Sequence, residues 1–130
     1  HRTMALEGPS GRPLWVSDHG GSNRPALSPH RVVVTDANGT VWALDKFSGT
    51  AAWQQPALAR RNLSAAVVQG DYAVVGDLDG YLHWLRLDDG EFAARERAGR
   101  DPIKGAPVVA DGVLVVQTVD GDVSAWRLNQ

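Results

Sequence analysis

Cysteine is absent from this chain of 130 residues, which excludes disulfide bonds, thiolate metal sites and cysteine nucleophiles from it. Long apolar runs are lacking as well. None approaches the roughly 20 residues that a membrane-spanning helix needs, and the first residues have no apolar core of a signal peptide. An excess of one charge is also missing, because 13 Lys and Arg face 15 Asp and Glu for a formal net charge of −2. We therefore expect no nucleic-acid partner, since no basic field covers the chain.

Long helical patterns are missing too, because 14 glycines and many aspartates interrupt the sequence at short intervals. The sequence has instead a hairpin frame that recurs. Its clearest copy is Val41–Trp53, in which a strand ends in Ala-Leu-Asp, a turn carries Ser-Gly and a second strand ends in Trp. Less regular copies of the frame are Ala5–Trp15 and Trp84–Ala94, at successive offsets of 38 and 41 residues. The chain is therefore built from repeats.

An offset of 41 residues brings further turn and strand positions into register. These are Gly39, Gly80 and Gly121, and Val34, Val75 and Val116. A period near 40 residues, with four short strand-like runs in each unit, is typical of a β-propeller blade. We predict an all-β fold, a β-propeller with about three blades of four-stranded antiparallel sheet. The residues interpreted as carrying the repeat are Leu44, Asp45, Gly49, Trp53, Gly80, Trp84 and Gly90.

The predicted units divide the chain into the end of one blade at 1–19, full blades at 20–57 and 58–99, and a three-stranded last blade at 100–130. This division gives 13 strands, fewer than the roughly 16–32 of propellers with four to eight four-stranded blades. Stacked repeats leave apolar faces open at both ends unless a ring closes. We therefore expect either a partial arc of a larger ring or an arc that closes with copies of itself.

Packing roles account for several residues within the units. Trp15 and Trp53 end the hairpin frame where a ring can wedge between neighbouring blades, which removes about 150–250 Å² from water. Residues 64–69 are small and suit an inner strand near the crowded centre of a propeller. Residues 91–97 are charged and suit an exposed outer strand. We interpret Tyr81 and His83 as half-buried packing residues of one strand.

No residue pattern predicts a catalytic, cofactor-binding or metal-binding site, and we expect no enzyme. The four histidines do not show the spacing of metal ligands. Eight aspartates occur at expected hairpins, where short carboxylates accept bonds from nearby backbone N–H groups, and we favour this role over calcium binding. They are Asp36, Asp77, Asp79, Asp88, Asp89, Asp111, Asp120 and Asp122. Paired carboxylates for acid–base chemistry need a shared cleft, which separate hairpins do not indicate.

Two local groups of cations remain as candidates for contact with a partner. The first lies in an expected loop between blades, and Arg60, Arg61 and Asn62 are the candidate partner-binding residues. The second consists of Arg95, Arg97, Arg100 and Lys104. For both groups the sequence favours solvated loop and edge positions over partner contact, because charge at an edge also prevents unwanted pairing.

The hairpin frame resembles the repeat of the pyrroloquinoline-quinone-type (PQQ-like) propellers, in which Ala-Leu-Asp, a small residue with Gly and a following Trp recur in each blade. Residues 43–45, Ser48-Gly49 and Trp53 match this pattern. More specific is the stretch Gly76–Trp84, followed by Asp89-Gly90 and by a Pro-Val-Val-Ala-Asp-Gly run near the C-terminus. These features resemble the last blades of the propeller lipoproteins of the outer-membrane β-barrel assembly machinery. The resemblance covers nearly all of residues 5–128.

This resemblance implies an eight-bladed periplasmic propeller with a non-catalytic scaffold role, tethered to the outer membrane by an N-terminal lipid whose cysteine is not among these residues. It implies as partners the periplasmic domains of the barrel-inserting outer-membrane subunit and unfolded outer-membrane proteins. One alternative is a quinone-dependent dehydrogenase of the same repeat family, which needs a vicinal cysteine pair or its equivalent and a metal-binding Glu/Asn/Asp set. Another is a ligand-sensing propeller, which would not need the Gly-Tyr-Leu-His-Trp stretch of residues 80–84.

We predict that the chain self-associates, because an open arc exposes two blade faces with apolar side chains. Those expected to be exposed are Leu6, Leu14, Val115 and Leu128. Patches larger than the roughly 300–600 Å² usual on a monomer tend to acquire partners. Light scattering over a range of concentrations measures this, and a stable monomer at high micromolar concentration would contradict it.

Overall fold

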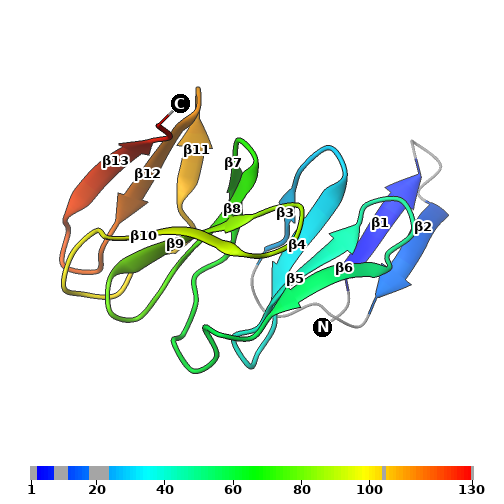
Figure 1. Ribbon diagram of the computed structural model, residues 1–130, viewed down its shortest axis with the longest axis horizontal. Coiled ribbons are helices and arrows are strands. Elements are labelled where there is room, and N and C mark those ends of the chain that lie inside the picture. The colour runs from blue at the N-terminus through cyan, green and yellow to red at the C-terminus, as the bar shows by residue number, and fades with distance from the viewer. Residues whose placement is uncertain (1–2, 8–11, 18–23, 104, 130) are drawn as a thin grey trace.

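The computed structural model describes residues 3–7, 12–17, 24–103 and 105–129, and every helix or strand among them is a β-strand. The strands form four antiparallel sheets that follow one another along the chain and stand side by side in Figure 1. The first sheet pairs β1 (Thr3–Glu7) with β2 (Arg12–Ser17). The all-β prediction is confirmed, and the turn predicted between these two strands lies outside the described residues.

The two central sheets have four strands each, and each meanders from an inner to an outer strand. The β3–β6 sheet contains β3 (Ala26–Leu27), β4 (Arg31–Thr35), β5 (Val41–Asp45) and β6 (Ala51–Gln55). The β7–β10 sheet contains β7 (Val67–Gln69), β8 (Tyr72–Gly76), β9 (Tyr81–Arg86) and β10 (Phe92–Arg97). Every side chain of β10 is exposed, as the sequence predicted for an outer strand.

The last sheet contains β11 (Val108–Ala110), β12 (Val113–Gln117) and β13 (Val123–Arg127). The strand order therefore agrees with the repeat read from the sequence. The blade limits at 1–19, 20–57, 58–99 and 100–130 stay a prediction.

The inner strand of the third sheet is shorter than the sequence predicted, because residues 64–66 lie outside the ladder. There the N–H of Ser64 donates to the carbonyl of Gly76 at 2.8 Å, while the N–H of Gly76 donates to Ser64 Oγ at 2.8 Å. A side-chain oxygen thus accepts the bond that a backbone carbonyl would accept in a regular strand. The regular pairing begins at Val67, which faces Val74.

The core lies between the sheets, and strands β8 and β9 of the third sheet are buried on both faces. One cluster joins Val33, Ala43 and Trp53 of the second sheet to Val75 and Leu85 of the third. A second cluster joins the third sheet to the fourth through Val74, Leu82, Trp84, Leu114 and Val116. Alternate residues of β8 therefore enter different clusters, which is why its sequence shows a continuous apolar run and no polar alternation.

Trp53 anchors the second sheet to a turn of the third, as expected for a ring wedged between blades. Its Nε1 donates to the carbonyl of Leu87 at 2.7 Å. Gln55 Nε2 donates to the carbonyl of Gly90 at 3.0 Å beside it. Gly90 has φ of 77°, and a Cβ at that position would lie 2.5 Å from Cε3 of Trp53. The glycine therefore serves two needs, the turn geometry and the close approach of the indole.

The exposed side chains expected at the ends of the chain are only partly found. Val115 is 39% exposed, in agreement with the prediction. The prediction for Leu128 was wrong, because this side chain is half-buried and packs on the cluster between the third and fourth sheets. The side chains of Leu6, Leu14 and Trp15 lie outside the described residues.

We predict that Trp53→Ala destabilises the chain more than Trp126→Ala. Trp53 is 9% exposed and makes a hydrogen bond between two sheets, so its loss should cost about 3–5 kcal/mol. Trp126 is half-buried and bonds to Ser124 within its own strand. Thermal melts of the two variants provide the comparison, and equal melting temperatures would argue against the packing role assigned to Trp53.

Candidate functional site: an aspartate network beside an outer groove

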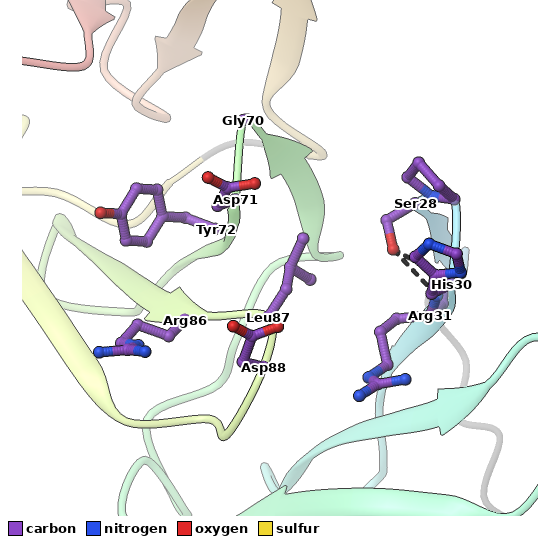
Figure 2. Close-up of a pocket in the computed structure, with 10 residues that line it drawn as sticks. Ser28, His30, Arg31, Gly70, Asp71, Tyr72, Arg86, Leu87 and Asp88 are labelled. Carbon is purple, nitrogen blue, oxygen red and sulfur yellow. Dashed lines mark hydrogen bonds between the residues drawn. The ribbon is translucent and has the colours of Figure 1, made fainter. Parts of the chain in front are cut away.

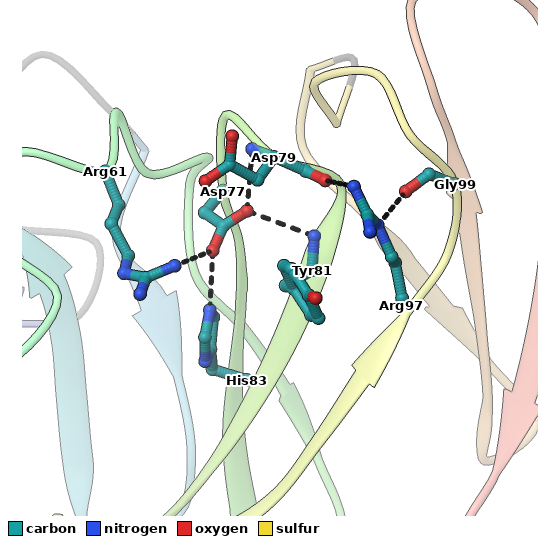
Figure 3. A network of polar contacts seen from close by, with 7 residues as sticks. All are labelled: Arg61, Asp77, Asp79, Tyr81, His83, Arg97 and Gly99. Atoms are coloured by element: carbon teal, nitrogen blue, oxygen red, sulfur yellow. Dashed lines mark hydrogen bonds and ion pairs between the residues drawn. The ribbon is translucent and has the colours of Figure 1, made fainter.

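The polar network in Figure 3 begins at the turn between β8 and β9, where Asp77 directly follows the last residue of β8. One carboxylate oxygen, Oδ1, accepts the N–H of Asp79 at 2.9 Å and that of Tyr81 at 3.0 Å. Asp36 makes the same two bonds one repeat earlier, to the N–H groups of Asn38 at 2.9 Å and Thr40 at 3.0 Å. This half of the network is the turn-forming role that the sequence predicted.

The second oxygen of Asp77 connects the turn to a strand and to a loop. His83 Nε2 lies 2.8 Å from Oδ2, and Arg61 Nη1 lies 3.2 Å from the same atom (Figure 3). The side chain of Asp77 is 0% exposed and that of His83 is 3% exposed, whereas that of Arg61 is 37% exposed. A buried carboxylate thus joins a buried ring to a cation that reaches solvent.

Burial in itself raises the pKa of Asp77, but the hydrogen bond to His83 and the backbone N–H groups of Tyr81 and Asp79 lower it. The charge of His83 lowers it as well, and the sum of these effects is a lowered pKa. The carboxylate is therefore ionised when the fold is intact at neutral pH. Its negative charge holds Arg61 against the sheet.

The structure corrects the sequence interpretation of His83, which is a buried member of a polar network and not a half-buried packing residue. A signal for this was present in the repeat. Asp36 and Trp42 are six residues apart, as are Asp77 and His83, and Trp42 Nε1 donates to Asp36 Oδ2 at 2.9 Å. The second and third sheets thus both place a ring nitrogen against the second oxygen of the turn aspartate.

The loop between β6 and β7 carries the predicted partner-binding residues. Leu58 fixes the loop in the core with 4% exposure, and the carbonyl of Arg61 accepts the N–H of Leu78 at 2.8 Å. Arg60 and Asn62 are exposed and have positive φ angles of 70° and 55°. Arg61 differs from both, because its guanidinium forms an ion pair with the buried carboxylate of Asp77. The partner-binding role of the three residues stays a prediction.

A groove beside this network runs along the outer strand β10 and has a volume of about 420 Å³. We call it the outer groove. It is lined by Leu58, Arg61, His83, Phe92 and Arg95, together with three alanines. The ring of Phe92 meets that of His83 edge-on, with centroids 6.2 Å apart. The loop and the outer strand therefore form its two walls.

The second predicted group of cations is arranged around Tyr81, one strand inward. The guanidinium carbons of Arg95 and Arg97 lie 5.1 Å and 4.9 Å from the centroid of its ring. Arg97 also donates to the carbonyls of Gly99 at 2.9 Å and Asp79 at 3.3 Å (Figure 3). The side chain of Arg95 makes no hydrogen bond or ion pair with any described residue. Lys104 lies outside the described residues.

A second hollow, of about 550 Å³, lies between the turn at Ser28–Arg31 and the turns at 70–72 and 86–88 (Figure 2). Its charges are mixed, because Arg31 lies on one wall and Asp71, Asp88 and Arg86 lie on the other. Such a mixture of charges does not indicate one kind of ligand. The outer groove differs because its lining contains no acidic side chain.

Chemistry beyond binding has little support in the described part of the chain. No group of three or more His, Asp or Glu residues there could hold a metal ion. Asp101 and Asp120 form a carboxylate pair at the surface, where the hydrogen bond and the charge of Asp120 raise the pKa of Asp101. We also find no helix among these residues that is long and apolar enough to cross a membrane.

Comparison with known proteins gives a consistent family. Residues 1–102 match the family model described as outer membrane protein assembly factor BamB. The assembly factor BamB of Xanthomonas campestris pv. campestris is 61% identical over 130 residues, which is 100% of this chain and 32% of that protein. BamB of Escherichia coli K12 is 36% identical over 119 residues, 92% of this chain and 30% of that protein. The chain thus spans about a third of the length of these curated relatives.

Solved structures confirm the propeller fold. The crystal structure of BamB from Moraxella catarrhalis superimposes with a TM-score of 0.87 at 26% identity, over 95% of this chain and 36% of that one. The computationally designed protein Ika8 gives 0.71 at 19% identity, over 91% and 37% of the two chains. A quinohemoprotein alcohol dehydrogenase from Pseudomonas putida gives 0.67 at 23% identity, over 85% and 19%. The last two comparisons show the fold alone.

We predict that Asp77→Asn destabilises the chain at neutral pH and flattens the dependence of its stability on pH in acid. The substitution leaves the buried ring of His83 and the part-exposed guanidinium of Arg61 without an anionic acceptor, at a cost of roughly 1–3 kcal/mol. The folded pKa of Asp77 is lowered, so its contribution is fully present above the unfolded value of about 4. That contribution is lost as pH falls through the folded value. Denaturant unfolding from pH 7 to pH 2 measures both effects, and parallel curves for parent and variant would contradict the assignment.

Proposed function

Because the chain belongs to the family of outer membrane protein assembly factor BamB, we propose that it forms part of a factor that acts in the assembly of outer-membrane proteins. The observation that carries the proposal is the 61% identity to the Xanthomonas BamB, which extends over all 130 residues. These relatives are named as an assembly factor and not as an enzyme, in agreement with the prediction that the chain is no enzyme.

In this proposal the chain is a non-catalytic scaffold that holds other proteins through its loops and strand edges. The support is structural: the described strands pack into rigid sheets, and the exposed cations project from a loop and an outer strand of that frame. Arg60, Arg61 and Asn62 are the loop residues proposed to touch a partner. Binding residues placed on loops of a rigid scaffold are a common arrangement.

The proposed partners are the periplasmic domains of the barrel-inserting subunit BamA and unfolded outer-membrane proteins. The proposed location is the periplasmic side of the outer membrane, with a lipid anchor in the whole protein. The relatives support this by their names, which refer to outer membrane assembly. The dehydrogenase alternative has less support, because the alcohol dehydrogenase resembles this chain in fold alone.

A chimera tests the proposal. These 130 residues would replace the matching region of the Escherichia coli BamB, to which the chain is 36% identical. We expect the chimera to co-purify with the barrel-inserting subunit and to restore the amounts of outer-membrane proteins in cells that lack their own BamB. Both are read by immunoblotting of membrane fractions.

The matched control replaces the same region with the corresponding stretch of the designed propeller Ika8, which shares the fold at 19% identity. This control should fold but should not restore assembly, because function depends on surface residues and not on the fold. Equal activity of the two chimeras would show that this region acts as a neutral spacer. If the chimera that carries these 130 residues failed to co-purify with the barrel-inserting subunit, the scaffold role would be wrong.

A further inference from the structure

The outer groove is lined by both apolar and cationic side chains, and a single ligand can contact both kinds. One wall is the loop at Leu58–Arg61, and the other is the exposed face of β10 with Phe92 and Arg95. Phe92 is 43% exposed, so part of its ring is accessible to a ligand. The alanines at positions 57, 93 and 94 leave the floor open beside it. The groove therefore offers an apolar surface between two cations.

Arg61 and Arg95 both have guanidinium N–H donors that can bind a ligand. A guanidinium carries five N–H donors, and Arg61 directs one nitrogen at Asp77. The guanidinium of Arg95 is stacked near the ring of Tyr81, and it forms no hydrogen bond or ion pair with a described residue. Glu96, the neighbour of Arg95 along the strand, lines the hollow on the other side of β10 and so does not neutralise the groove. Donors held in place in this way match carboxylates on a ligand.

Asp77 fixes the position of both walls of the outer groove, so the groove is a preorganised part of the fold. It holds Arg61 at 3.2 Å on the loop side and His83 at 2.8 Å on the sheet side. His83 in turn supports the ring of Phe92 edge-on, at 6.2 Å between centroids. A ligand that meets Arg61 and Phe92 together meets groups that need little ordering, which lowers the entropic cost of binding.

We propose that the outer groove binds an acidic, extended polypeptide segment that carries one large apolar side chain. The apolar side chain packs on Phe92, and carboxylates on either side of it meet Arg61 and Arg95. The ligand is a polypeptide because the groove is hollow and runs along a strand, whereas a membrane surface would need cations that project together from one flat face. This inference rests on the proposed scaffold function and names the chemistry of one partner segment.

The binding test uses the full chain and a fluorescein-labelled peptide of Asp and Glu residues around one Phe, measured by fluorescence anisotropy. Arg95→Glu should weaken binding by about tenfold or more, because it turns an attraction into a repulsion. Phe92→Ala should weaken it by about three- to tenfold, through lost apolar contact. The matched control is Arg127→Glu, which makes the same change of charge at an exposed position of β13 outside the groove and should stay within about twofold.

Three further ligands make the test specific. A peptide with Ala in place of Phe should bind about as weakly as the parent peptide binds Phe92→Ala, and a peptide with Lys in place of the acids should not bind. Vesicles of phosphatidylcholine and phosphatidylglycerol should not be retained by the chain. Melting temperatures of the three variants should match the parent, since all three substituted side chains are exposed.

Several outcomes would overturn the proposal. Equal loss in Arg95→Glu and Arg127→Glu would mean that only overall charge matters, and vesicle binding without peptide binding would assign the cations to lipid. The chimera separates this inference from the proposed function. A chimera that restores assembly and keeps its partner when Arg95 is changed to Glu would refute the groove alone, while a chimera that fails to restore assembly would refute the function whatever the peptide does.

Discussion

Burial of apolar side chains between successive sheets is the interaction on which the rest of this structure depends. The inner part of the β7–β10 sheet has no polar face of its own, since Ala73 and Val75 of β8 enter one cluster and Val74 enters the other. A sheet of this kind is stable only between neighbours. Trp53 and Gly90 fix the spacing on one side, because an indole needs a turn without a side chain to approach the next sheet. The loops and outer strand then have defined positions, which a binding surface requires.

The turn aspartates extend this order from the core to the surface. Asp36 and Asp77 each accept two N–H groups of their own turn and contact a ring nitrogen of the strand that follows. In the third sheet the ring is His83, and the same carboxylate also holds Arg61. A turn former in one repeat thus becomes the link between a loop and a strand in the next. This is how a repeated frame acquires a local difference without loss of the fold.

The period, the strand order and the turn glycines could be predicted from the sequence, because each depends on local geometry. Gly39, Gly80 and Gly121 all adopt positive φ, which the 41-residue offset alone suggests. The network around Asp77 could not be predicted in the same way. Its turn bonds already explain an aspartate at that position, and the approach of Arg61 depends on a loop with positive φ at Arg60 and Asn62. Such angles in residues other than glycine are uncommon and have no signal in composition.

The features that distinguish this propeller from others of its fold lie where the chain departs from its own repeat. Position 42 is Trp and position 83, one repeat later, is His, a smaller ring that leaves room for Arg61 and Phe92 at its edges. A designed propeller and an alcohol dehydrogenase share the sheets, so the sheets themselves do not specify a partner. Specific binding has to come from side chains that the repeat does not require. In the described part of the chain, Arg61, Phe92 and Arg95 meet that condition together at one groove.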